Sequence, residues 1–388
     1  MTPGGQSRLS SVRLLTSAMA DPTTTGQAQA SPDCGHSRTC GEVAHDQSPD
    51  TTQADQQPPT CCSSDHVTTT SCIMSPNTEC DDNTQTCMVG AKVTGLEGMD
   101  ILRLGEINYF QFSISPDLLR HQQRVGHLTL RPDDVITVGF PRSGNHWTFE
   151  VVNMILHQRV DFEKDHFYSR LLEYLGENIQ ERLDSLPSPR NMTSHYRLHH
   201  LPVQVREQGV KVIYVMRNPK DVLVSLYNFS VSLAHERSRF SGTWSQFLDL
   251  QMAGEFPWGA WWDHVSAAEA FIGQFPGCPV HVLVYERLKR EPAAEIGRLC
   301  RFLARPDSLA EEIARATEFS HMKAVLSKTK MAEQGSKHFK NGASSVLRAG
   351  QVGGWRDWFS AAQSEAFDRL FQEKMSESKL AALVRPFM

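Results

Sequence analysis

Residues 133–147 read DDVITVGFPRSGNHW, and this stretch decides how the rest of the sequence is interpreted. The apolar run 135–140 is typical of a strand that is buried on both faces. A short polar turn follows it, and from Trp147 to Ile155 apolar residues recur at helical spacing. This order predicts a strand, a tight turn and a helix. The unpaired backbone N–H groups of a first helical turn bind phosphate-like or sulfate-like anions.

The turn also carries side chains that suit an anion. Arg142 supplies a permanent charge, Ser143 and Asn145 supply donors, and Gly144 lets the backbone approach a ligand closely. A standard P-loop continues with lysine and a hydroxyl residue that holds magnesium, and both are missing here. The turn therefore predicts an anion site without a metal and disfavours a nucleotide kinase, which stays an alternative.

Two further apolar runs, 210–216 and 280–285, predict strands of the same kind. Helical patterns lie between the strands, at 147–155, 165–183 and 222–227. This alternation predicts an α/β fold, a three-layer sandwich with a central, mostly parallel sheet and a P-loop-like nucleotide site. The tryptophan-rich segment 244–262 is interpreted as a helix and a loop that pack on the core.

The end of the second predicted strand repeats the pattern of the first. Arg217 follows the strand, Asn218 is a good N-cap, and Ser225 lies two turns into the next helix. Ligands of such sheets bind beyond the carboxyl ends of the strands, so two arginines there could hold two phosphates of one nucleotide. The alternative for Arg217 is a surface ion pair with Asp221. A third element is the glycine-rich stretch 345–355, in which Arg348 could close over a phosphate.

Composition separates the chain into two regions. Of 388 residues 40% are hydrophobic, and no apolar run is long enough to predict a membrane span. The net charge of −5 gives no support to a nucleic-acid surface. Residues 1–94, rich in Ser, Thr and Gln, are expected to be a disordered tail, and residues 95–388 to be the folded domain. The tail holds seven of the nine cysteines, and their spacing favours reduced thiols over a zinc site or disulfides.

Taken together, these motifs resemble the cytosolic sulfotransferase family over residues 95–385. The family's Tyr-Pro-Lys-Ser-Gly-Thr-Thr-Trp is similar to residues 140–147, and its Arg-Asn-x-Lys-Asp-x-x-x-Ser to 217–225. Further matches lie at 285–286, 317–319 and 348–350. The resemblance implies transfer of a sulfuryl group from 3′-phosphoadenosine 5′-phosphosulfate to a hydroxyl or amine of a small apolar acceptor, without a metal.

The resemblance also assigns roles to residues. His195 would be the general base and Arg142 would stabilise the charge of the leaving phosphate. A reading shifted by five positions would choose His200 instead, because Leu-Pro follows it. The residues that would bind the nucleotide are Arg142, Ser143, Gly144, Asn145, His146, Trp147, Arg217, Ser225, Tyr285, Thr317, Phe319, Arg348 and Gly350.

Three positions depart from the family pattern. Arg142 replaces a lysine and keeps its charge, whereas Thr193 and Ala349 replace lysines and lose it. The two lost charges place the turnover rate in question and support a second alternative, a non-catalytic or weakly active binder of a nucleotide or small molecule. A membrane-anchored carbohydrate sulfotransferase is disfavoured, because neither a span nor a signal sequence is evident.

The remaining expectations concern the acceptor, assembly and location. Phe140 and Phe229 are candidates for the acceptor pocket, with core packing as the alternative for Phe140. The family's dimer motif corresponds to residues 356–365, whose charged ends are kept and whose middle differs, which leaves a homodimer open. A cytoplasmic location is expected. Residues 1–20 resemble a transit peptide in composition, so mitochondrial import is a minor alternative.

Overall fold

The computed structural model describes residues 96, 99–110, 117–163, 167–328, 337–340 and 348–388. The region that we expect to be disordered, 1–94, lies outside these described residues, as do its cysteines and the candidate transit segment 1–20.

The described domain is built on a parallel sheet of four strands, in the order β4-β3-β5-β6. The strands are β3 (Val135–Gly139), β4 (Asn191–Ser194), β5 (Lys211–Met216) and β6 (Val280–Val284). The three predicted strands are confirmed to within one residue at either end. Because β4 lies on one side of β3 and β5 on the other, the chain reverses its direction of travel across the sheet at β3.

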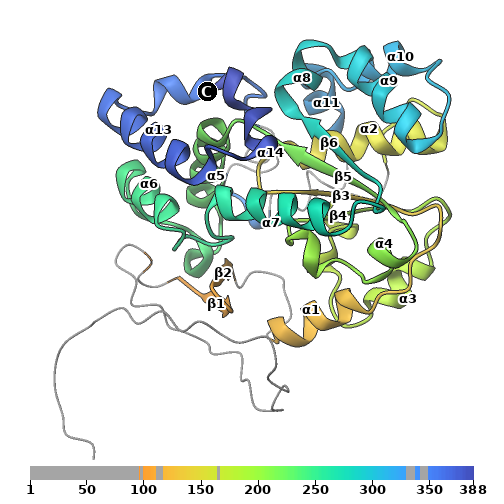
Figure 1. Ribbon diagram of the computed structural model, residues 1–388, viewed down its shortest axis with the longest axis horizontal. Coiled ribbons are helices and arrows are strands. Elements are labelled where there is room, and N and C mark those ends of the chain that lie inside the picture. Colours follow the sequence, from red (N-terminus) through yellow and green to blue (C-terminus); the bar gives the residue numbers. More distant parts are fainter. Residues whose placement is uncertain (1–95, 97–98, 111–116, 164–166, 329–336, 341–347) are drawn as a thin grey trace, which may run out of the picture. The chain divides into compact units, whose positions relative to one another are not determined.

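Helices cover both faces of the sheet, so the predicted three layers are confirmed (Figure 1). Along β5, Ile213 and Val215 pack into a cluster with α2 (Asn145–His157), α9 (Pro292–Leu303) and α10 (Ala310–Ala316). The alternate residues Val212, Tyr214 and Met216 pack into a second cluster on the opposite face. That cluster includes α5 (Pro219–Ser232), α6 (Trp244–Met252), α7 (Trp261–Gln274) and α13 (Ala361–Met375).

The prediction of one helix over 165–183 was wrong. The described part of this segment holds the short 3₁₀ helices η1 (Phe167–Ser169) and η2 (Leu172–Tyr174) and the helix α3 (Ile179–Asp184). Leu171 forms a parallel bridge with Thr193 of β4, and Gly176 has a φ of +69°. Both features are incompatible with a continuous helix, because they need extended or left-handed backbone.

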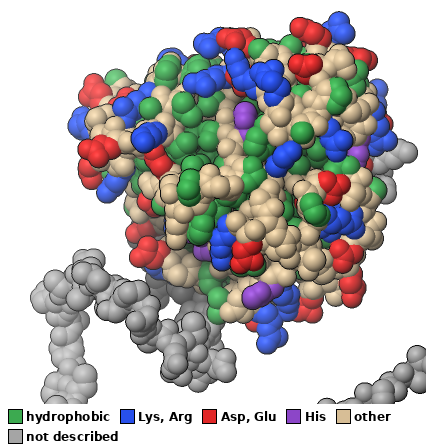
Figure 2. Space-filling model, turned by 45° about the vertical axis from the view of Figure 1, so that its right-hand side comes forward, with side chains coloured by type: hydrophobic (Ala, Val, Ile, Leu, Met, Phe, Trp, Pro, Cys, Tyr) green, Lys and Arg blue, Asp and Glu red, His purple; other side chains and the backbone are tan. Residues whose placement is uncertain are grey.

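Several smaller elements complete the domain. They are α1 (Leu118–Gly126), η3 (Leu198–His200), α4 (Gln204–Glu207), η4 (Glu236–Ser238), α8 (Tyr285–Arg290), α11 (Phe319–Leu326), η6 (Gly354–Asp357), α14 (Lys379–Ala382) and η7 (Arg385–Phe387). In the described ranges, no helix has both the length and the apolar character that crossing a membrane requires. Figure 2 shows acidic and basic side chains interspersed over one face of the domain.

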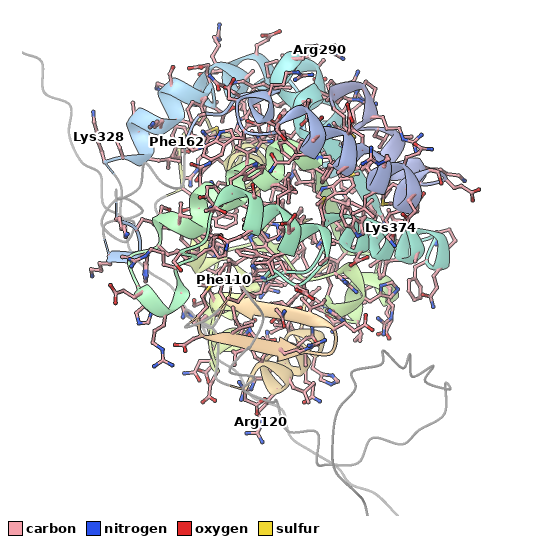
Figure 3. The ribbon with its side chains drawn as sticks, turned by 90° about the vertical axis from the view of Figure 1, so that its left-hand side faces the viewer. Phe110, Arg120, Phe162, Arg290, Lys328 and Lys374 are labelled. Carbon is pink, nitrogen blue, oxygen red and sulfur yellow. The ribbon has the colours of Figure 1, made fainter. Side chains whose placement is uncertain are left out.

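An antiparallel hairpin, β1 (Ile101–Leu104) and β2 (Ile107–Phe110), was not predicted from the sequence. In Figure 3 it lies below the helices, with Phe110 directed toward them and Arg120 of α1 directed away. Phe110 packs edge-on against Phe256 with ring centroids 5.7 Å apart, and the carbonyl of Asn108 accepts from the backbone N–H of Trp258 at 2.6 Å. The hairpin therefore supports the loop that carries Trp258.

Candidate functional site

The four parallel strands end at one edge of the sheet, and a candidate residue follows each of them. Phe140 follows β3, His195 follows β4, Arg217 follows β5 and Tyr285 follows β6. A cavity opens at this edge, and all the predicted site residues except Phe140 and Ser143 line it. The sheet thus brings together residues that are far apart in the sequence, as expected for ligand sites of open parallel sheets.

The turn after β3 has an unusual backbone. Arg142 has a φ of +71° and Gly144, the N-cap of α2, a φ of +107°. The side chains of Ser143 and Asn145, which we predicted as donors to the anion, are both buried. Ser143 is fully buried, and the Asn145 amide donates to the Phe140 carbonyl at 3.2 Å. The N-terminal end of α2, rather than these side chains, is therefore the part suited to an anion.

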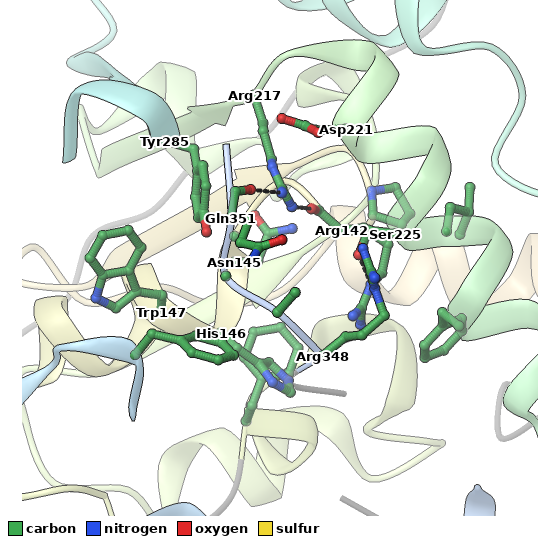
Figure 4. A pocket seen from close by; sticks show the side chains of 18 of the residues that line it. Arg142, Asn145, His146, Trp147, Arg217, Asp221, Ser225, Tyr285, Arg348 and Gln351 are labelled. Carbon is green, nitrogen blue, oxygen red and sulfur yellow. Dashed lines mark hydrogen bonds between the residues drawn. The ribbon is translucent and has the colours of Figure 1, made fainter. Parts of the chain in front are cut away.

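Three arginines from separate segments approach the cavity (Figure 4). Arg142 Nε donates to Ser225 Oγ at 3.2 Å. Arg217 donates to the carbonyls of Arg142 and Gln351 at 3.1 and 3.0 Å. Burial, together with the charges of Arg217 and Arg348, lowers the pKa of Arg142 to about 10, and the guanidinium stays charged at neutral pH. Such a cluster of cations suits a ligand with several negative charges.

Asp221 lies in the same cavity but is not paired with an arginine at ion-pair distance. Its carboxylate accepts from the backbone N–H groups of Gly353 at 2.7 Å and Trp355 at 2.9 Å. The proposed alternative of an Arg217–Asp221 ion pair is therefore not what the geometry shows. Instead, Asp221 fixes the loop between Arg348 and η6 against α5.

His195 presents one nitrogen as a base. Its Nδ1 lies 2.9 Å from the Gly139 carbonyl, and a carbonyl only accepts, so Nδ1 carries the proton. The Asn145 amide lies farther from the same nitrogen, at 3.4 Å. Burial lowers the pKa of His195 to about 4, which leaves the ring neutral and Nε2 unprotonated at neutral pH. His200 does not line the cavity, so the geometry favours His195.

Aromatic rings enclose the other end of the cavity. Trp147 and Tyr285 meet edge to face with centroids 5.4 Å apart, and Phe319 faces Gly350. A Cβ atom on Gly350 would lie 2.4 Å from the Phe319 ring, so only glycine fits there. Lys289, which sequence reasoning missed, lies between Trp147 and Phe319 with Nζ 5.8 and 5.9 Å from their ring centroids. Thr317, by contrast, donates its hydroxyl to a helix carbonyl.

A second group of aromatic residues lies near His195. Trp258 is 5.5 Å from the His195 ring, and His146 is 3.7 Å from Phe167 between centroids. Phe229 lines the cavity as predicted, whereas Phe140 is buried and packs against His264. Sequence reasoning missed the aromatic residues Phe167, Tyr168, Tyr174 and Trp258 of this group and the apolar Leu171 beside them in the lining. Gly254 and Gly259, on either side of Trp258, could have indicated a loop with a positive φ, and both glycines have one in the structure.

In the part of the chain that the structure describes, no group of three His, Cys, Asp or Glu side chains could hold a metal ion. Among the described residues that line the cavity, two buried nitrogen donors have no hydrogen-bond partner within the described chain, Trp147 Nε1 and Arg217 Nε. Unpaired buried donors are costly unless a ligand accepts from them. Both belong to residues that line the cavity, so they fit a ligand rich in oxygen and nitrogen acceptors.

Comparisons with known proteins agree with this site. A family model described as the sulfotransferase domain matches residues 132–379. Sulfotransferase 1 family member D1 of Mus musculus is 31% identical over 295 residues, 73% of this chain and 97% of the relative. Sulfotransferase 1E1 of Homo sapiens is 33% identical over 274 residues, 68% and 91%.

Solved structures show the same fold. The mouse sulfotransferase SULT7A1, crystallised with PAP, has a TM-score of 0.60 and 27% identity, covering 74% of this chain and 99% of its own. A retinol dehydratase crystallised with androsterone and PAP has a TM-score of 0.58 over 72% and 90%, and at 18% identity it supports the fold alone.

Proposed function

The chain belongs to the sulfotransferase domain family and is a sulfotransferase that uses 3′-phosphoadenosine 5′-phosphosulfate, and we propose how its residues divide the work. His195 acts as the general base, and the arginines and the start of α2 hold the nucleotide. One observation carries this proposal. A single cavity has arginines in one part, together with donors that have no partner among the described residues, and a neutral imidazole in another, whose Nε2 likewise has no partner among them.

The nucleotide is proposed to lie along the carboxyl edge of the sheet. The turn 142–147 takes the 5′-phosphosulfate, because the N-terminus of α2 concentrates positive potential there. Arg217, Ser225 and Arg348 take the 3′-phosphate. Trp147, Tyr285 and Phe319 enclose the adenine, and Gly144 and Gly350 leave room for these rings. Thr317 contributes packing, because its hydroxyl is already used within the chain.

The reaction follows from these positions. The nucleotide, when bound, supplies the sulfuryl group and a phosphate as leaving group. His195 Nε2 takes the proton of the acceptor hydroxyl while the hydroxyl oxygen bonds to sulfur, and the bond from sulfur to the phosphate oxygen breaks with its electrons. Arg142 offsets the negative charge that grows on that phosphate. Removing one preorganised donor of this kind typically lowers kcat by about 100-fold or more.

The acceptor is proposed to be a small apolar molecule that offers one hydroxyl or amine. The walls around His195 are aromatic, formed by Phe167, Tyr168, Phe229 and Trp258. Aromatic walls with few polar groups favour flat or apolar ligands and leave the base to select the reacting group.

Assembly and location remain predictions. The stretch 356–365 exposes Arg356, Asp357 and Glu365, which makes a homodimer contact feasible, and light scattering of the purified chain would test it. For the cytoplasmic location and its mitochondrial alternative, a fluorescent fusion with and without residues 1–20 is the direct test.

The function is tested by calorimetric titration with 3′-phosphoadenosine 5′-phosphate. We expect Arg217→Ala to weaken binding by about 10- to 100-fold, because it removes a charged donor worth roughly 1.5–3 kcal/mol. Arg120→Ala is the matched control, since Arg120 is exposed on α1, does not line the cavity and should leave the affinity unchanged. Failure of the wild-type chain to bind the nucleotide would overturn the proposal.

A further inference from the structure

We propose that Glu173 and His264 are positioning residues, which hold the two peptide groups on either side of His195 and thereby aim its imidazole into the cavity. The inference rests on the proposed role of His195 as the base. It concerns two buried side chains that do not line the cavity themselves and that the mechanism above leaves unused.

His195 needs such support because of its place in the sheet. β4 is an edge strand, and its last pairing with β3 joins Ser194 to Val138. His195 is the first residue beyond that ladder, so the sheet no longer fixes its backbone. A base must be held within about 0.5 Å of its working position, so the constraint has to come from elsewhere.

On the N-terminal side the constraint is Glu173 of η2. Its Oε1 accepts from the backbone N–H of His195, from the N–H of Tyr196 at 2.9 Å and from Ser194 Oγ at 2.9 Å. Glu173 is fully buried, and no other side chain of the described residues donates to this oxygen. The bridge between Leu171 and Thr193 places η2 beside the free edge of β4. One carboxylate oxygen therefore accepts from three donors, one on the last residue of β4 and two in the turn after it.

On the C-terminal side the constraint is His264 of α7. Its Nε2 lies 3.2 Å from the His195 carbonyl, so Nε2 carries the proton and donates. Its Nδ1 then accepts from the Tyr214 hydroxyl at 2.8 Å. Burial lowers the pKa of His264 to about 3, which keeps the ring neutral and this tautomer in place.

The imidazole of His195 is held at a third point by the Gly139 carbonyl of β3. The contacts come from three separate elements, η2, α7 and β3, so together they fix the backbone and the ring orientation of one residue. Because a displacement of about 1 Å costs about 100-fold in rate, releasing one of the peptide contacts should reduce kcat about 10- to 100-fold. The nucleotide site is not touched, so its KM should stay unchanged.

The test compares substitutions that keep or remove each hydrogen bond. Glu173→Gln keeps an oxygen that accepts, and His264→Gln keeps an N–H that donates, so both should retain kcat within about 3-fold of the wild type. Glu173→Leu and His264→Leu remove the contacts and should lose about 10- to 100-fold in kcat at an unchanged KM for the nucleotide. Leucine variants with wild-type kcat, or glutamine variants as slow as leucine variants, would overturn the proposal.

Loss of stability alone is separated from loss of position by two controls. Leu303→Ala removes a buried side chain of α9 on the other face of the sheet, and its kcat below the melting temperature should equal that of the wild type. If the leucine variants do not fold, Tyr214→Phe tests the proposal instead, because it deletes only the hydroxyl that donates to His264 Nδ1. Reduced kcat at constant KM supports the proposal, and wild-type kcat overturns it.

The failure of this inference can be told from the failure of the proposed function. His195→Gln should abolish transfer, and if it does not, the assignment of the base is wrong. If His195→Gln is inactive while the leucine variants are fully active, only the positioning is wrong. A readout without substrate is the ¹⁵N spectrum of the labelled imidazoles, assigned with His195→Gln. We expect a single Nδ1–H tautomer of His195 in the wild type and the glutamine variants, and a mixture in the leucine variants.

Discussion

Gly144→Ala is the sharpest test of how the turn after β3 fits the cavity. Gly144 has a φ of +107°, a region that side chains other than glycine rarely adopt. A Cβ atom added there would lie 2.6 Å from Cδ2 of Tyr285, well inside the 3.4 Å at which ordinary van der Waals contact begins. The ring cannot simply move away, because the Arg217 guanidinium lies 4.3 Å from its centroid.

The expected cost has two parts. The strained backbone of a non-glycine residue contributes about 1–3 kcal/mol. Displacing Tyr285 from its contact with Arg217 adds about 0.5–2 kcal/mol, the usual worth of a cation–π contact. We therefore expect the free energy of unfolding to fall by roughly 1.5–5 kcal/mol. Nucleotide affinity should fall at least about 10-fold, because both the turn and the ring that would enclose adenine shift.

Gly105→Ala supplies the matched control. Gly105 also has a positive φ, +59°, but a Cβ atom there would meet nothing within 4 Å. The control should lose only about 1–2 kcal/mol and keep full nucleotide affinity. Urea denaturation measures the first quantity and calorimetric titration with 3′-phosphoadenosine 5′-phosphate the second. If Gly144→Ala is no less stable than Gly105→Ala and binds the nucleotide normally, the described contact between Gly144 and Tyr285 does not matter and the reasoning is refuted.

Three further predictions concern charge. Because burial holds the pKa of His195 near 4, kcat/KM should decline only as the pH falls toward 4, and a decline centred at pH 6.5 would show an exposed imidazole. Burial raises the pKa of Glu150 to about 8, so the carboxyl binds a proton more tightly in the folded chain than in the unfolded chain. The free energy of unfolding therefore falls as the pH rises from about 4.5 to 8. Glu150→Gln should remove this pH dependence. Denaturation should show that the free energy of unfolding of the wild type falls by at least about 1 kcal/mol between pH 5 and pH 8, whereas that of the variant does not fall for this reason. Ala349→Lys adds a cation to the lining of the cavity and should tighten nucleotide binding about 3- to 10-fold at low salt, with the gain shrinking at high salt; an equal affinity at low salt would contradict it.

The sequence predicted those parts of the fold that depend on continuous apolar runs. β3, β5 and β6 are such runs, and the residues that follow them lie at one edge of the sheet because the strands are parallel. β4 was not predicted because Asn191, Thr193 and Ser194 are polar, although all three are buried. Tertiary partners bind two of these side chains, because the Asn191 amide donates to the Phe149 carbonyl at 3.0 Å and Ser194 Oγ donates to Glu173 at 2.9 Å. Such partners are visible only in the folded chain.

The candidate site divides in the same way. Residues next to strand ends were predictable, whereas Tyr168 and Tyr174 reach the cavity from the short 3₁₀ helices η1 and η2, and Trp258 from a loop. These segments are too short to show a periodic pattern. Trp258 has a φ of +80° and is held by the hairpin through the carbonyl of Asn108. A positive φ at a bulky residue needs support from its surroundings, and no local pattern announces it.

The electrostatic character of the cavity depends on how one carboxylate is used. Asp221 is the one acidic side chain among the described residues that line the cavity, where it could have neutralised Arg217 or Arg348. Its two oxygens instead accept from the backbone of Gly353 and Trp355, which ties the loop after Arg348 to α5. The same contact therefore holds the loop that carries Arg348 at the cavity. Because Asp221 forms no close ion pair with Arg217 or Arg348, these two positive charges attract an anionic ligand more strongly than they would if Asp221 were paired with one of them.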